Sequence, residues 1–110
     1  MIPYGKHTLF EDDISAVTEV LKKGFLTQGE QVPAFEQALC DYTGAAFAVA
    51  CNSGTSALHI ACLAAGVKNG DVVWTVPNSF AASANCARYC GAEVDFVDID
   101  PVTRNLCTAS

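Results

Sequence analysis

Near its middle the chain contains the stretch Val49-Ala50-Cys51-Asn52-Ser53-Gly54-Thr55-Ser56-Ala57-Leu58, an apolar run that ends in a small polar turn and continues as a helical pattern. The N–H groups in the first turn of a helix lack partners within the helix, so such a turn directs several donors toward one point. Gly54 permits a close approach to the backbone, and the hydroxyls of Ser53, Thr55 and Ser56 add donors. The stretch predicts a phosphate-binding turn, with the alternative that Ser53 only caps a buried helix.

The segments around this stretch predict an α/β fold. Residues 46–51 are uniformly apolar, as in a buried parallel strand. A helix is expected over 54–65, and strands are expected at 71–76 and 93–99 on either side of a small-residue helix over 81–90. The region therefore reads as β-α-β-α-β, because each connection is long enough to join parallel strands.

A second polar turn, Asn78-Ser79-Phe80, follows the strand at 71–76. Ligands of such sheets bind beyond the carboxyl ends of the strands, so Ser53–Thr55 and this turn are expected to face one crevice. A ring at Phe80 can stack on a planar ligand, a contact worth about 0.5–1.5 kcal/mol beyond burial, or Phe80 can belong to the core. Trp74 is expected in the core. Neither G-x-G-x-x-G nor G-x-x-x-x-G-K-[ST] occurs, so neither common nucleotide-binding loop is predicted.

Residues 1–44 are expected to form an extended arm and two helices. The first helix is capped by Asp12 or Asp13, buries one apolar face and ends at Gly24. After a glycine-bounded loop, a second helix with Pro33 in its first turn runs to about residue 42. The predicted division is thus an N-terminal part, 1–44, and the start of an α/β domain, 45–110.

The charge balance excludes two classes of partner. Six Lys and Arg against twelve Asp and Glu give a net charge of −6 at pH 7, whereas nucleic acids and anionic membranes require a basic face. No targeting pattern is evident, so we expect a cytoplasmic protein with no membrane contact. Only 16% of the residues are charged, against about 25% in typical domains, which predicts a part of a larger protein.

The cysteine pattern predicts free thiols. No C-x-x-C motif occurs, and most of the cysteines fall in apolar patterns, where cysteine packs as a small hydrophobe. Reduced thiols are typical of a reducing compartment. His7 and His59 are too few and too far apart to form a metal cluster, so no metal site is predicted.

Several motifs occur in a fixed order along the chain: Leu26-Thr27-Gln28-Gly29, Phe35-Glu36, the Asn52 to Leu58 run, Gly70-Asp71, Pro77-Asn78-Ser79-Phe80, and Gly91 to Asp98. Together they resemble the N-terminal part of the DegT/DnrJ/EryC1/StrS family, which are pyridoxal-phosphate (PLP)-dependent sugar aminotransferases of fold type I. The opening Pro3-Tyr4-Gly5 and the run from Phe35 to Tyr42 look most similar to the branch that aminates a UDP-linked 4-keto-6-deoxy sugar on the route to pseudaminic acid.

The resemblance implies the first part of a three-layer α/β/α large domain, incomplete over these residues, with PLP as cofactor. Gly54 and Thr55, with Ser53 beside them, would bind the cofactor phosphate. Phe80 would stack on the pyridine ring, and Ser79 would add a polar contact.

The resemblance also implies the substrate side of the site. Thr27, Gln28 and Gly29 would line the entrance used by the substrate or by the neighbouring subunit, and Tyr4 would join them. The expected partners are a UDP-linked keto sugar, an amino-donor amino acid such as glutamate, and a second copy of the protein in a homodimer with a shared active site.

No catalytic residue is assigned, because the family's lysine and the acidic residue beside its cofactor lie beyond residue 110, and none of the four lysines matches the catalytic position. The segment is therefore expected to be inactive alone. Two alternatives stay open: a sugar dehydratase of the same family, with histidine in place of the lysine, and a non-catalytic phosphate-ligand or interaction module. In the family, strands outside this chain separate the 46–51 strand from the others, so the segment alone should expose sheet edges and apolar faces.

Overall fold

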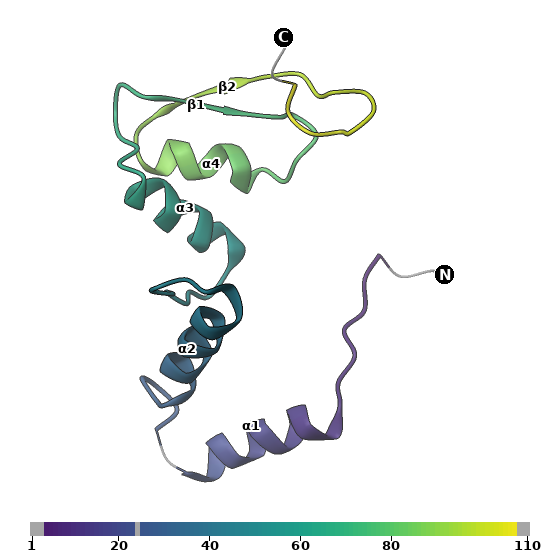
Figure 1. Cartoon of the computed structure of the whole chain (residues 1–110), viewed down its shortest axis with the longest axis vertical. Helices are drawn as coiled ribbons and strands as arrows, with labels where there is room; N and C mark the ends of the chain where they lie inside the picture. Colours follow the sequence, from purple (N-terminus) through teal and green to yellow (C-terminus); the bar gives the residue numbers. More distant parts are fainter. Residues whose placement is uncertain (1–3, 24, 108–110) are drawn as a thin grey trace. The chain divides into compact units, whose positions relative to one another are not determined.

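The computed structural model describes residues 4–23 and 25–107. The chain forms two compact units, Met1–Val49 and Ala50–Ser110, which are considered separately below. Figure 1 labels the helices and strands. The first residues of the expected arm and the helix-ending Gly24 lie outside the described residues.

Helix α1 of the first unit spans Glu11–Lys23. The Asp13 carboxylate accepts a hydrogen bond of 2.9 Å from the backbone N–H of Phe10, so Asp13 caps the helix from inside its first turn. Acidic residues occupy the first turn and lysines the last, which is the favourable arrangement for the helix dipole. The Lys23 Nζ also lies 2.9 Å from a carboxylate oxygen of Glu19, although exposed pairs of this kind add little stability.

Helix α2 spans Gln31–Thr43 and contains Pro33 in its first turn, as predicted. A proline is tolerated there because the first-turn N–H groups have no partner within the helix. Gly44 ends the helix in the left-handed conformation (φ 74°), and its N–H donates to the Cys40 carbonyl at 2.8 Å.

The prediction that α1 buries one apolar face is wrong for this structure. Ile14, Val17 and Leu21 have exposed fractions of 50%, 62% and 64%, and α1 and α2 are not a packed pair among the described residues. The apolar stripe is present, but the described residues of unit 1 leave it exposed. No helix in the described ranges has the length and apolar character needed to cross a bilayer.

The second unit confirms the α/β class. Strands β1 and β2 pair in parallel, with Val72 opposite Glu93 and Thr75 opposite Phe96. Helix α4 connects the two strands and packs on both, and α3 packs on α4 (Figure 1). The elements, in chain order, are α3 (Gly54–Ala64), β1 (Val72–Thr75), α4 (Ala82–Tyr89) and β2 (Glu93–Phe96).

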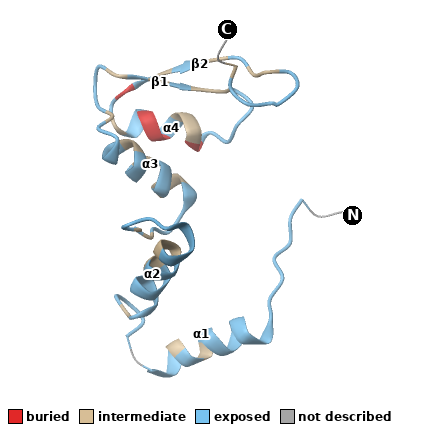
Figure 2. Ribbon diagram, viewed as in Figure 1, coloured by how far each residue is buried: buried red, intermediate tan, exposed pale blue. Residues whose placement is uncertain are grey.

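The core of this unit is small and lies along α4. The buried side chains, shown red in Figure 2, are those of Ala82, Cys86, Ala87 and Ala92. The prediction of Trp74 in the core is wrong, since 66% of the residue is exposed. Side chains alternate along a strand, and β1 alternates between exposed and half-buried positions, so Trp74 lies on the face of the sheet away from α4.

The expected strand at 46–51 is also absent from the described structure. The segment belongs to no strand, and Phe47 and Val49 are 89% and 72% exposed. A strand requires a hydrogen-bonded neighbour, and the two described strands pair with each other. The observed order in unit 2 is therefore α-β-α-β, in place of β-α-β-α-β.

Candidate functional site: the turn before α3

Ser53 is the N-cap residue of α3. Its backbone is extended (φ −161°, ψ 156°), and its Oγ accepts a hydrogen bond of 3.2 Å from the N–H of Ser56. The Ser53 carbonyl accepts the first helical hydrogen bond, from Ala57 at 3.0 Å. The cap considered as an alternative from the sequence is therefore present, and it satisfies one first-turn N–H group, that of Ser56.

The hydroxyls of Ser53 and Ser56 are joined to Asn52. The Ser56 hydroxyl donates to Asn52 Oδ1 at 2.9 Å, and the two serine Oγ atoms lie 3.0 Å apart. Because a hydroxyl has one hydrogen, and that of Ser56 goes to Asn52, Ser53 must donate in the bond between the two serines. The Ser53 hydrogen is thus engaged within the turn.

Two backbone donors remain at the start of α3. The N–H groups of Gly54 and Thr55 precede the point at which helical hydrogen bonds begin, and the hydrogen bonds among residues 4–23 and 25–107 include none from either group. A Cβ atom at Gly54 would meet no atom within 4 Å, so there is open space beside this residue. We call Ser53–Thr55 the phosphate cradle, since two N–H groups and the Thr55 hydroxyl suit a phosphate.

The second predicted turn precedes α4. Phe80 is 76% exposed, so it does not belong to the core of this structure. The Ser79 and Ser83 Oγ atoms lie 2.9 Å apart, and the Phe80 carbonyl accepts from the N–H of Ser83 at 2.9 Å. These bonds fix the turn at the beginning of α4.

Both turns belong to unit 2 and precede helices that pack on each other. In Figure 1 the N-terminal ends of α3 and α4 lie on the same side of the unit as the carboxyl ends of β1 and β2. This is the edge at which ligands of parallel sheets bind. The turns that precede α3 and α4 therefore lie toward one end of the unit.

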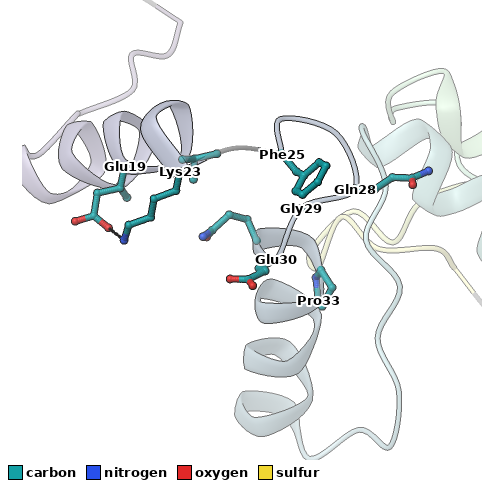
Figure 3. A pocket seen from close by; sticks show the side chains of 10 residues that line it. Glu19, Lys23, Phe25, Gln28, Gly29, Glu30 and Pro33 are labelled. Atoms are coloured by element: carbon teal, nitrogen blue, oxygen red, sulfur yellow. Dashed lines mark hydrogen bonds and ion pairs between the residues drawn. The ribbon is translucent and has the colours of Figure 1, made fainter.

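The predicted entrance residues lie in unit 1. Gln28 and Gly29 line a hollow of about 680 Å³ between α1 and α2, whereas Thr27 and Tyr4 do not line it (Figure 3). Gln28 has a positive φ of 55°, an uncommon conformation for a residue with a side chain. The other lining residues are Ala16, Glu19, Val20, Lys23, Phe25, Glu30, Gln31 and Pro33.

Asn52 was not selected as a site residue from the sequence, and Ser56 was counted only as a further donor. The signal that would have identified their link is their spacing of four residues across the helix start, which brings side chains into contact. Their hydrogen bonds determine which groups of the cradle remain available.

None of the six cysteines forms a disulfide in the described structure. Burial, together with the neighbouring Cys86 and Cys90 thiols, raises the pKa of Cys62 from 9.0 to about 11. These three thiols lie where α3 packs on α4. In the described part of the chain, no group of cysteine, histidine or carboxylate side chains is arranged to hold a metal ion.

One carboxylate of unit 2, that of Asp100, accepts hydrogen bonds in the turn after β2. Backbone N–H groups of Thr103 and Val102 donate to Asp100 Oδ1 and lower the pKa of this carboxyl, the Val102 bond measuring 2.9 Å. Asp100 thereby stabilises the turn.

Unit 2 combines a parallel α/β arrangement with free N–H groups at the start of α3, which suit an anionic group. Residues 7–110 match the model of the DegT/DnrJ/EryC1/StrS aminotransferase family. The chain belongs to this family.

The relatives agree in sequence and in structure. The chain is 48% identical over 99 residues to the UDP-4-amino-4,6-dideoxy-N-acetyl-beta-L-altrosamine transaminase of Campylobacter jejuni, covering 90% of this chain and 26% of that protein. It is 36% identical to Helicobacter pylori PseC, an aminotransferase involved in pseudoaminic acid biosynthesis, with a TM-score of 0.82 over 89% of this chain and 27% of that one.

A Streptococcus pneumoniae structure solved in its PLP-form is 30% identical, with a TM-score of 0.88 over 96% of this chain and 27% of that one. The chain thus spans about a quarter of the length of the relatives that it matches.

Proposed function

We propose that the chain is the N-terminal segment of a PLP-dependent aminotransferase that transfers an amino group, from glutamate, to a UDP-linked 4-keto-6-deoxy sugar. Membership of the family and the similarity to an altrosamine transaminase support this assignment. The product would enter pseudaminic acid or a related surface polysaccharide. The observation that carries the proposal is the pair of free N–H groups at Gly54 and Thr55, at the same end of the unit as the exposed Phe80.

The residues present fit PLP. Gly54 and Thr55 would donate their N–H groups to its phosphate, the Thr55 hydroxyl would add a third donor, and Ser53 would hold the turn in shape. Phe80 would lie against the pyridine ring, with Ser79 beside it. When bound, PLP acts as an electron sink for the carbon that exchanges its amino group.

The substrate side is proposed to include residues of unit 1. Gln28 and Gly29 line a hollow there, and Thr27 and Tyr4 would join them at the entrance, where a second copy of the protein in a homodimer would complete the site. The free thiols favour a cytoplasmic protein, and the acidic composition disfavours nucleic-acid or membrane partners.

We assign residues 1–44 to the arm and first helices, and 45–110 to the start of the PLP-binding domain. The lysine that binds the cofactor would belong to the remainder of the protein, since Lys23 pairs with Glu19 and Lys68 follows the C-terminal end of α3, away from the cradle.

The complete protein provides the test. It should contain bound PLP and should transfer ¹⁵N from labelled glutamate to a UDP-linked 4-keto-6-deoxy sugar, detected by the mass of the sugar product. Loss of a sugar hydroxyl as water, without ¹⁵N transfer to the sugar, would instead establish the dehydratase. Absence of PLP binding would support a non-catalytic module.

A further inference from the structure

The hydrogen bonds around Ser53 give two further residues a function. We propose that Asn52 and Ser56 are positioning residues of the phosphate cradle, which hold the Ser53 hydroxyl as a cap so that only Gly54 and Thr55 present donors to the phosphate. This inference rests on the proposed function, because it assumes that PLP is the ligand.

The hydrogen bonds among Asn52, Ser53 and Ser56 have a defined direction. Ser56 donates its hydroxyl hydrogen to Asn52 Oδ1 at 2.9 Å, and so its Oγ can only accept from Ser53 at 3.0 Å. The Ser53 Oγ at the same time accepts from the Ser56 backbone N–H at 3.2 Å. The Asn52 amide oxygen thereby sets the orientation of both hydroxyls.

This arrangement has a consequence for the ligand. The Ser53 hydrogen points into the turn, so it is not available to an anion. Fixing the cap also fixes the backbone of the first turn, and preorganised donors bind more tightly because less conformational freedom is lost on binding. Ser53 would therefore act on PLP through the backbone that it holds.

The test uses the complete protein and compares the dissociation constants of PLP and of pyridoxal, which lacks the phosphate. Ser56→Ala and Asn52→Ala should each weaken PLP binding by about 3- to 10-fold, the value of one hydrogen bond, and leave pyridoxal binding unchanged. Because both residues act through the same set of hydrogen bonds, the double variant should lose no more PLP affinity than about the larger of the two single losses.

Ser56→Thr keeps the hydroxyl and should bind PLP as the wild type does. Thr43→Ala, which removes a hydroxyl bonded to Leu39 at the end of α2, is the matched control.

Additive losses in the double variant, or equal losses for PLP and pyridoxal, would overturn the positioning role. Unchanged PLP binding in both single variants would also overturn it while leaving the proposed function in place. If the complete wild-type protein fails to bind PLP, the proposed function fails, and the positioning role fails with it.

Discussion

The backbone carbonyl oxygen of Phe25 lies 2.7 Å from the point that a Cβ atom would occupy at Gly29. Gln28, the preceding residue, adopts a positive φ of 55°. The loop before α2 therefore closes on itself so tightly that only glycine fits at position 29. A side chain at position 29 would therefore force a change in this loop, which we propose borders the substrate entrance.

Gly29→Ala in the complete protein should distort this loop. Overpacking against backbone costs about 1–3 kcal/mol, so the melting temperature should fall and the KM for the UDP-sugar should rise, while the absorbance of bound PLP is retained. Gly5→Ala is the control, because a Cβ atom there would meet no atom within 4 Å. Wild-type stability and KM for Gly29→Ala would show that the loop is not held as described.

Phe80→Ala tests the stacking role of an exposed ring. Phe80 is 76% exposed, so its truncation should change the melting temperature of the cofactor-free protein little. Loss of a stacking contact of about 0.5–1.5 kcal/mol should weaken PLP binding by about 2- to 13-fold, measured by equilibrium dialysis. Phe10→Ala, at another exposed phenylalanine, should leave PLP binding unchanged. Equal PLP binding in Phe80→Ala and wild type would remove Phe80 from the site.

Cys62 should resist alkylation in the folded protein. Only a thiolate reacts, and a pKa raised from 9.0 to about 11 leaves about fifty times less thiolate at pH 9 than in the unfolded chain. Reaction with iodoacetamide, followed by mass spectrometry, should accelerate only toward pH 11. In urea the same thiol should react with a midpoint near pH 9.0. A midpoint near 9.0 in the folded protein would contradict the clustering of Cys62 with Cys86 and Cys90.

The same shift links stability to pH. Between pH 9 and 11 the folded state keeps the Cys62 proton that the unfolded state releases, so the stabilisation present below pH 9 is lost as the pH rises toward 11. Cys62→Ala should flatten this part of the stability curve. If the stability of Cys62→Ala falls as steeply as that of the wild type between pH 9 and 11, groups other than Cys62 cause the fall.

Residues 1–110 expressed alone should bind a hydrophobic dye or aggregate. Large apolar side chains are exposed on α1 and on β1, for example Leu21 at 64% and Trp74 at 66%, and exposed apolar patches of this kind promote association. Dye fluorescence and light scattering give the measurement. A cooperative thermal transition without dye binding would show that the segment is self-sufficient.

The sequence predicted the local structure well, because local signals determine it. Gly44 ends α2, Ser53 begins α3, and both positions follow from the residue type. The α/β class followed in the same way from the alternation of apolar runs and helical patterns.

The segments that pair with a strand or cover an apolar side chain, by contrast, lie far away in the sequence. Residues 46–51 have the composition of a buried strand, yet they form no strand in the described structure. Apolar character predicts Trp74 in the core and allows a core position for Phe80, and both residues are exposed. The direction of the Ser53, Ser56 and Asn52 hydrogen bonds also required the structure, since composition alone does not show which hydroxyl donates.

The central claim is that the start of α3 binds the phosphate of PLP through the backbone at Gly54 and Thr55. The most direct measurement is the dissociation constant of PLP for the complete protein and its Gly54→Val variant, with pyridoxal as the ligand that lacks the phosphate. A valine would crowd the open space beside Gly54, so PLP binding should weaken at least tenfold while pyridoxal binding is retained. Equal PLP affinity in the variant and the wild type would contradict the phosphate cradle.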